Sequence, residues 1–118
     1  MNPVGWFEIA VSDMDRAMTF YEAALGMTLS KQEVGGQQMA WFPVEKETAY
    51  GATGALVLGE PGASATTVYF GVNSIEDVLD RVPEGAVVVP KTAIGENFGF
   101  FAQLRDSEGN LIGIHSHT

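Results

Sequence analysis

Glu8 and His115 are the two side chains of this sequence best suited to acid–base chemistry. Side chains alternate between the two faces of a predicted strand at 6–11, so Glu8 shares one face with Trp6 and Ala10. An indole beside a carboxylate shields the carboxylate from water, and this desolvation is expected to raise its pKa. A raised pKa suits a group that gives and takes protons. We therefore predict that Glu8 acts as a general acid or base, with a buried structural carboxylate as the alternative.

His115 and Tyr69 are predicted to lie on the corresponding face of two other strands. The isoleucines of the last strand must pack against a helix, so His115 points to the opposite side, and Tyr69 does the same in the stretch 67–72. This phase predicts that Glu8, Tyr69 and His115 meet in one pocket, where Tyr69 and His115 would orient a developing oxyanion. Simple packing for Tyr69, and a position at the mouth of the cleft for His115, are the alternatives.

Further side chains are predicted to line the same cleft and to bind a small, partly apolar ligand, because aromatic walls with a few polar groups are typical of such sites. For each of them, packing in the core or in a dimer interface is the alternative. This set consists of Trp6, Met39, Trp41, Thr67, Phe101 and Gln103. Lys91 and Arg105 would attract an anionic substrate or simply lie on the surface, and Gly95 and Gly99 flank a loop that could serve as a lid.

The elements that must position these residues occur in the same order twice: a strand, a helix, then three strands. In the first half, Ser12 is the predicted helix cap, Gly26 the predicted stop, and apolar side chains at 14, 17, 18, 21 and 25 form one stripe. The predicted strands of this half are 6–11, 28–34, 37–44 and 54–58, with a turn at Gly35–Gly36 and a loop over 45–53.

The second half repeats this pattern at an offset of 61 residues, with few identical residues. Its helix is predicted to start at a cap in Asn73–Ser74 and to end before Pro83 and Gly85. Its predicted strands are 67–72, 86–90, 98–105 and 111–116, with turns at 91–97 and 106–110. The sequence therefore predicts an α+β fold of two βαβββ modules, 1–60 and 66–118, in a single domain of 1–118.

Composition narrows the class of protein. The chain has 118 residues, no cysteine, and a formal charge of −9 from six basic and fifteen acidic residues. Disulfides and thiolate chemistry are excluded, and this charge argues against nucleic acid or an anionic membrane as a partner. Without a secretory signal at the start or an apolar run of membrane-spanning length, a cytoplasmic location is predicted.

The segments DMDRAMTFYEAALGM near the start and DSEGNLIGIHS at the end resemble the vicinal oxygen chelate superfamily of glyoxalase I, bleomycin-resistance proteins and extradiol dioxygenases. The segments GALVLGE, VYFGV and VPKTAIGENFGFFAQLRDSEGN are most similar to small proteins related to lactoylglutathione lyase. The resemblance covers essentially the whole chain. It implies a glyoxalase-like fold of paired βαβββ modules, commonly assembled as a homodimer.

The resemblance also implies four metal ligands, from the first, fourth, fifth and last strands. The corresponding positions here are Trp6, Thr67 and Gly113, and the stretch 54–58 has no side chain that could serve. The usual ligand set is therefore missing. Because Glu8 and His115 each lie two residues beyond a ligand position, a displaced divalent metal site remains open, and the cofactor is unknown.

Two functions follow from these observations. The first is an enzyme related to lactoylglutathione lyase, of lyase or isomerase type, that acts on a small carbonyl- or hydroxyl-bearing metabolite. The second is a non-catalytic protein of the bleomycin-resistance type that sequesters an aromatic or planar ligand on Trp6, Trp41 and Phe101.

Overall fold

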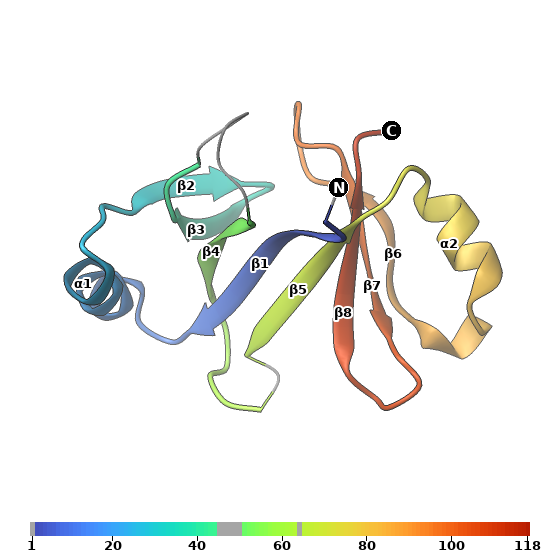
Figure 1. The fold of residues 1–118 in the computed structure, drawn as a ribbon, viewed down its shortest axis with the longest axis horizontal. Helices are drawn as coiled ribbons and strands as arrows, with labels where there is room; N and C mark the ends of the chain where they lie inside the picture. The colour runs from blue at the N-terminus through green and yellow to red at the C-terminus, as the bar shows by residue number, and fades with distance from the viewer. Residues whose placement is uncertain (1, 45–50, 64) are drawn as a thin grey trace. The chain divides into compact units, whose positions relative to one another are not determined.

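The computed structural model describes residues 2–44, 51–63 and 65–118 (Figure 1). It confirms the predicted order of elements, in which a strand, a helix and three strands occur twice. The second half has an additional short 3₁₀ helix. The elements of the first half are β1 (Val4–Val11), α1 (Met14–Leu25), β2 (Ser30–Val34), β3 (Gln37–Trp41) and β4 (Thr53–Leu58). Those of the second half are β5 (Thr66–Gly71), α2 (Ile75–Arg81), η1 (Glu84–Ala86), β6 (Val87–Ala93), β7 (Phe100–Arg105) and β8 (Leu111–Ser116).

The described chain forms two compact units. One is Trp6–Thr66, in which the strands lie in the order β2-β3-β4-β1 and the β1–β4 pair is parallel. The other joins the residues up to Gly5 with Thr67–Thr118, in the order β5-β8-β7-β6 with a parallel β5–β8 pair. Each unit therefore pairs the first strand of a predicted module with the last, which confirms the predicted α+β class.

Helix α1 begins one residue later than the sequence predicts. Asp13, not Ser12, is the N-cap, and its Oδ1 accepts a hydrogen bond from the backbone N–H of Arg16 at 3.0 Å. The Ser12 hydroxyl instead accepts a bond from Arg16 Nη2 at 3.3 Å, so the predicted Ser12 cap is wrong. Gly26 ends the helix as predicted, because at φ 66° it adopts the left-handed conformation and its N–H bonds the Glu22 carbonyl.

Each unit has its own apolar core between its helix and one face of its sheet. In the first unit, Phe7, Ile9 and Val11 lie on the core side of β1, as the alternation predicts. The buried members of this core are Val11, Met14, Leu29, Ala40, Phe42 and Leu56. Leu25, predicted as the last residue of the α1 stripe, is also the last residue of the helix and is 53% exposed.

The second core confirms the phase of β5 and β8. Ile112 and Ile114 point to α2, which starts at the predicted cap, where Ser74 Oγ accepts a bond from the Asp77 N–H at 3.2 Å. The buried members of this core are Ile75, Ala102, Leu104 and Ile114. Tyr69, Gly113 and His115 are therefore on the opposite face of this sheet, as predicted.

Several predicted boundaries are wrong by one to three residues. The turn predicted to start at Lys91 belongs to β6, which runs to Ala93, because the pairing with β7 continues past Pro90. Residue 86 belongs to the 3₁₀ helix, β7 begins at Phe100, β3 ends at Trp41 and β2 begins at Ser30. Of the loop predicted over 45–53, residues 45–50 lie outside the described residues. No helix in the described part of the chain is long and apolar enough to cross a membrane.

The turn between β7 and β8 is held by one carboxylate. Asp106 accepts hydrogen bonds from the backbone N–H groups of Glu108 and Asn110, at 2.9 Å each, and from the Asn110 side chain at 3.1 Å. These bonds hold the pKa of Asp106 below its ordinary value of 3.8, and the bonds from Asn110 have the largest effect. This turn joins the two strands that carry Gln103 and His115, so it helps to position them.

Because the pKa of Asp106 is lowered in the folded protein, its contribution to stability is complete above the unfolded-state pKa and is lost as the pH falls through the lower folded-state pKa. In Asp106→Asn we therefore expect the free energy of unfolding to depend less steeply on pH below about pH 4. Urea unfolding at a series of acidic pH values measures this slope. Asp80→Asn removes an exposed carboxylate of α2 and serves as the control; equal slopes in the two variants would contradict the role of Asp106.

Candidate functional site

The face of the first sheet opposite its core carries Trp6, Glu8, Met39 and Trp41, which we call the tryptophan face. Two strand pairings bring them together: Glu8 lies beside Ala55 in the parallel β1–β4 pair, and Trp41 lies on the other side of Ala55 in the antiparallel β3–β4 pair. Met39 and Trp41 alternate onto the same side of β3, as the sequence predicts. Glu8 and Trp41 are thus next-nearest neighbours across a small alanine.

Hydrogen bonds and ring contacts order the tryptophan face. The Trp6 indole N–H donates to Glu8 Oε2 at 3.2 Å, and the Trp41 indole N–H donates to Met39 Sδ at 3.5 Å. The two indole rings meet edge to face, with centroids 5.6 Å apart. Glu8 is partly buried. Its carboxylate is therefore oriented by an indole and partly shielded from water, which is an environment suited to proton transfer.

The corresponding face of the second sheet carries Tyr69, Phe101, Gln103 and His115, which we call the histidine face. Tyr69 and Gln103 lie on either side of Gly113, and the Gln103 side chain donates to the Tyr69 hydroxyl oxygen at 2.9 Å. Phe101 lies directly opposite His115 in the β7–β8 pair, and its ring meets that of Tyr69 edge to face at 6.5 Å. This face combines aromatic area with three polar groups.

Gly113 is required for this arrangement. A Cβ at this position would collide with the Tyr69 ring, which lies over the glycine and is only 6% exposed. Thr67, two residues before Tyr69 on β5, is also buried. Side-chain size at position 113 therefore decides where the tyrosine hydroxyl lies.

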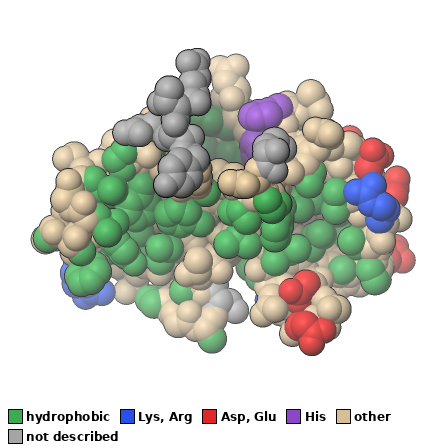
Figure 2. Space-filling view, in the orientation of Figure 1, with side chains coloured by type: hydrophobic (Ala, Val, Ile, Leu, Met, Phe, Trp, Pro, Cys, Tyr) green, Lys and Arg blue, Asp and Glu red, His purple; other side chains and the backbone are tan. Residues whose placement is uncertain are grey.

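His115 has a defined hydrogen-bond partner. Its Nε2 lies 2.7 Å from the carbonyl oxygen of Phe98, and the His117 ring lies perpendicular to it with centroids 5.1 Å apart. Figure 2 shows histidine side chains, in purple, on the visible surface of the molecule. Because a carbonyl oxygen only accepts hydrogen bonds, His115 Nε2 is the donor.

The two faces are built on the same grid. Glu8, Ala55 and Trp41 form a row across the first sheet, and Tyr69, Gly113 and Gln103 form the matching row across the second. Ala55 is thus the counterpart of Gly113, and Gly113 is one of the positions at which the resemblance implies a metal ligand. The registers therefore place an alanine and a glycine, neither of which can bind a metal ion through its side chain, at corresponding positions of the two units.

The residues present do not fit the metal site of the resemblance. The positions implied for its ligands are Trp6, Thr67 and Gly113, and none of them offers the imidazole or carboxylate that the resemblance implies. Within 2–44, 51–63 and 65–118, no group of three or more His, Asp or Glu side chains lies close enough together to hold a metal ion.

The structure brings the predicted site residues together in two groups. Trp6, Glu8, Met39 and Trp41 belong to the first unit, and Thr67, Tyr69, Phe101, Gln103 and His115 belong to the second. The meeting of Glu8 with Tyr69 and His115, and the displaced metal site on Glu8 and His115, stay predictions. Sequence reasoning missed the Phe98 carbonyl, for which Gly99 is the only and indirect signal. It also missed the roles of Ala55 and Gly113, which strand alternation would have revealed.

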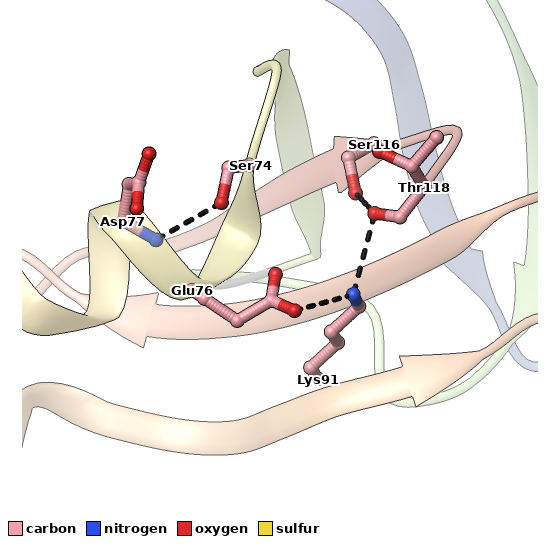
Figure 3. A network of polar contacts seen from close by, with 6 residues as sticks. All are labelled: Ser74, Glu76, Asp77, Lys91, Ser116 and Thr118. Carbon is pink, nitrogen blue, oxygen red and sulfur yellow. Dashed lines mark hydrogen bonds and ion pairs between the residues drawn. The ribbon is translucent and has the colours of Figure 1, made fainter.

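Lys91 and Arg105, considered above as attractors of an anion, both make contacts within the protein. Lys91 Nζ lies 2.9 Å from Glu76 Oε2 and donates to the Thr118 carbonyl oxygen at 3.3 Å (Figure 3). It also lies over the Phe100 ring. The bond from Lys91 holds the pKa of Glu76 below its ordinary value. Arg105 donates to the Gly109 carbonyl oxygen at 3.0 Å. These contacts favour a structural role for both.

Comparison with known proteins gives a family and a fold. The family model described as Glyoxalase/Bleomycin resistance protein/Dioxygenase superfamily matches residues 4–114. A variant of the methylmalonyl-CoA epimerase of Streptomyces coelicolor, in complex with 2-nitronate-propionyl-CoA, is 18% identical, with a TM-score of 0.70 over 100% of this chain and 99% of that chain.

Two further solved structures show the same fold. The methylmalonyl-CoA epimerase of Mycobacterium tuberculosis is 18% identical, with a TM-score of 0.66 over 98% of this chain and 88% of that chain. A hypothetical protein from Bacillus halodurans is 18% identical, with a TM-score of 0.69 over 98% of this chain and 94% of that chain. A search of curated protein sequences found none that matches. At these identities the similarity establishes the fold and leaves the reaction open.

Proposed function

Because this chain belongs to the Glyoxalase/Bleomycin resistance protein/Dioxygenase superfamily, we propose that it is an enzyme of isomerase or lyase type that moves a proton in a small metabolite. The substrate carries a carbonyl or hydroxyl group, and Glu8 is the residue that takes and returns the proton. The observation that carries the proposal is the Glu8 carboxylate, partly buried and held by the Trp6 indole at 3.2 Å.

The chemistry follows from that environment. A carboxylate whose orientation is set by a hydrogen bond needs little reorganisation to remove a proton from the carbon next to a carbonyl group. The negative charge then develops on the substrate oxygen, which needs a hydrogen-bond donor. On the histidine face, Tyr69 is the candidate donor, because a phenolic hydroxyl can donate a hydrogen bond and the bond from Gln103 fixes the position of its oxygen.

The charge of the protein favours a small substrate of low negative charge. The chain has a formal charge of −9, Lys31 is paired with Asp15 at 2.7 Å, and Lys91 is paired with Glu76. A coenzyme A thioester carries several phosphate charges and is repelled by such a surface. Although the epimerases above act on such thioesters, we infer a smaller substrate for this protein.

Proton exchange with solvent tests the proposal whatever product the enzyme forms. The protein is incubated in D₂O with the hemithioacetal of methylglyoxal and glutathione, dihydroxyacetone, acetoin, lactate and methylmalonyl-CoA, and ¹H NMR follows loss of the signal from the carbon next to the carbonyl. We expect faster exchange in at least one small compound and none in the thioester. Absence of exchange throughout the panel would overturn the proposal.

The aromatic content of the tryptophan face supports a second candidate function, that of a binding protein. Trp6 and Trp41 form an edge-to-face pair beside Met39, which is a surface suited to a planar ligand. Titration with planar aromatic compounds such as acridine, followed by tryptophan fluorescence, tests this function. Tight binding that is equal in wild type and Glu8→Gln, together with no proton exchange, would favour sequestration over catalysis.

Metal removal is expected to leave the activity unchanged. The positions that would supply the ligands hold Trp6, Thr67 and Gly113, and the stretch 54–58 has no side chain that could serve, so the proposed proton transfer does not depend on a metal. Dialysis against EDTA, followed by the exchange assay and elemental analysis by plasma mass spectrometry, measures this. About one equivalent of a divalent ion per chain, lost in both Glu8→Gln and His115→Ala, would instead establish the displaced metal site.

A homodimer remains part of the proposal. Helix α1 offers exposed apolar side chains for a subunit contact, since Phe20 is 64% exposed and Leu25 53%. Light scattering coupled to size-exclusion chromatography is expected to give twice the 12.6 kDa mass of the chain. A mass of one chain at all concentrations would contradict it.

A further inference from the structure

The loop between β6 and β7 is closed upon itself. The Ile94 N–H donates to the Gly99 carbonyl oxygen at 3.0 Å, so residues 94–99 form a compact turn. Three residues of this turn have left-handed backbone conformations: Gly95 at φ 109°, Asn97 at φ 70° and Gly99 at φ 79°. The asparagine is the only non-glycine residue with a positive φ among residues 2–44, 51–63 and 65–118. The conformation of this loop therefore depends on particular residues at these three positions.

Gly99 lets this loop approach the end of β8. A Cβ on Gly99 would collide with the carbonyl oxygen of Ser116 and would lie 3.2 Å from His115 Nε2. The backbone position also needs the left-handed conformation that glycine adopts at little cost. Two independent requirements, conformation and space, thus restrict position 99 to glycine.

The close approach places a carbonyl group on His115. The Phe98 oxygen lies 2.7 Å from Nε2, which donates its hydrogen. The backbone of His115 is held as well, since its carbonyl oxygen accepts from the Val72 N–H at 2.8 Å and its strand pairs with Phe101. With the ring and the backbone both held, Nε2 carries the hydrogen in the neutral imidazole and Nδ1 carries the lone pair.

We propose that the loop 94–99 is a positioning element that locks His115 in the Nε2–H tautomer, and that His115 Nδ1 selects ligands that present a hydroxyl group. A neutral imidazole in this tautomer accepts a hydrogen bond at Nδ1 and has no hydrogen there to donate. His115 therefore binds a ligand O–H and does not stabilise an oxyanion, which is a different role from that expected from the sequence. This ligand class narrows the proposed function, on which it rests.

The tautomer is measured directly in the ligand-free protein. Long-range ¹H–¹⁵N correlation spectra of ¹⁵N-histidine protein at pH 8.5 distinguish a protonated from an unprotonated ring nitrogen, and His117→Asn assigns the two rings. We expect a protonated Nε2 and an unprotonated Nδ1 for His115. The opposite pattern in wild type would overturn the proposal, whatever the exchange assay gives.

A matched pair of glycine variants tests the loop. Gly109 has φ 85° and open space around its Cβ position, so Gly109→Ala carries the backbone strain of Gly99→Ala without its collisions. In Gly99→Ala we expect the His115 nitrogen resonances to shift toward the average of the two tautomers, and in Gly109→Ala to stay in place. Unchanged His115 resonances in a folded Gly99→Ala protein would overturn the positioning role.

Two probe compounds test the selection and do not require Gly99→Ala to fold. Hydroxyacetone and acetone share a carbon skeleton and differ in one hydroxyl group. Titration of wild type at matched concentrations is expected to shift the His115 Nδ1 resonance with hydroxyacetone only. His115→Phe, whose ring has no nitrogen to accept a hydroxyl group, is expected to bind the two equally. Equal shifts with the two compounds, or no shift with hydroxyacetone, would overturn the proposed ligand class. The tautomer measurement and the proton-exchange assay do not depend on this result.

Discussion

In Glu8→Gln, the rate of proton exchange between substrate and solvent is expected to fall by about 10²- to 10⁴-fold, the usual contribution of a positioned general acid or base. Glutamine keeps the size of the side chain and an oxygen that accepts from the Trp6 indole, and it removes only the group that carries the proton. The exchange assay in D₂O, run with the compound that responds best in wild type, measures the effect on kcat and on KM separately.

Glu33→Gln is the control for this prediction, because Glu33 is an exposed carboxylate on β2 of the same unit. Its exchange rate is expected to match that of wild type. The free energy of unfolding of Glu8→Gln should also stay within about 0.5 kcal/mol of wild type, so that the loss reflects chemistry. Exchange at the wild-type rate in a folded Glu8→Gln protein would remove Glu8 from the mechanism.

Gly113→Ala is expected to lower the free energy of unfolding by about 1–3 kcal/mol, the usual cost of an extra methyl group in a packed site. The new Cβ meets the Tyr69 ring, which is buried and fixed by its bond to Gln103, so the ring must move or the strands must separate. Urea unfolding followed by circular dichroism measures the loss.

Gly85→Ala separates this collision from the general effect of replacing glycine. Gly85 has no atom within 4 Å of its Cβ position and no positive φ, so alanine is expected to leave stability unchanged or to raise it by about 0.4–1 kcal/mol. A second measurement comes from the tyrosine: displacement of Tyr69 should change its NMR ring signals in Gly113→Ala alone. Equal stability of the two variants would contradict this prediction, because it would mean that the sheet accommodates the methyl group at position 113 without cost.

The layout of the fold was predictable because strand alternation and helix stripes recur twice in the chain. Phe7, Ile9 and Val11 alternate with Glu8, and the observed core takes the three apolar side chains. The same phase correctly assigned Ile112 and Ile114 to the second core. These predictions rest on burial, which acts over many residues at once and so tolerates an error in any one of them.

The ends of elements were less predictable because single hydrogen bonds decide them. Ser12 and Asp13 are both good caps, and only the backbone direction after Val11 decides that Asp13 reaches the Arg16 N–H. Strand β6 continues through Pro90 to Ala93 because a register shift in its pairing accommodates the proline. Neither feature has a signature in residue type alone.

For the candidate site, the sequence predicted which side chains share a face of the sheet, but it did not predict the contacts made by the backbone. Trp6, Glu8 and Trp41 share a face because of side-chain alternation, which the sequence displays. The bond from His115 to Phe98 is made by a main-chain carbonyl, which every residue carries, so residue types cannot reveal it. The glycine at position 99 is the indirect sign of that contact, and it resembles an ordinary turn residue until the loop is seen.

The hydrogen bond from the Gly71 N–H to the Pro3 carbonyl oxygen, at 2.9 Å, means that the first few residues complete the second unit, although the first unit follows them in the chain. A single scission in the connection at 59–66 would therefore not yield two independently complete fragments. The C-terminal fragment would lack the Pro3 carbonyl oxygen that accepts from Gly71 of β5, and the N-terminal fragment would carry residues that belong to the second unit. During synthesis, Pro3 can make this bond only after Gly71 has left the ribosome.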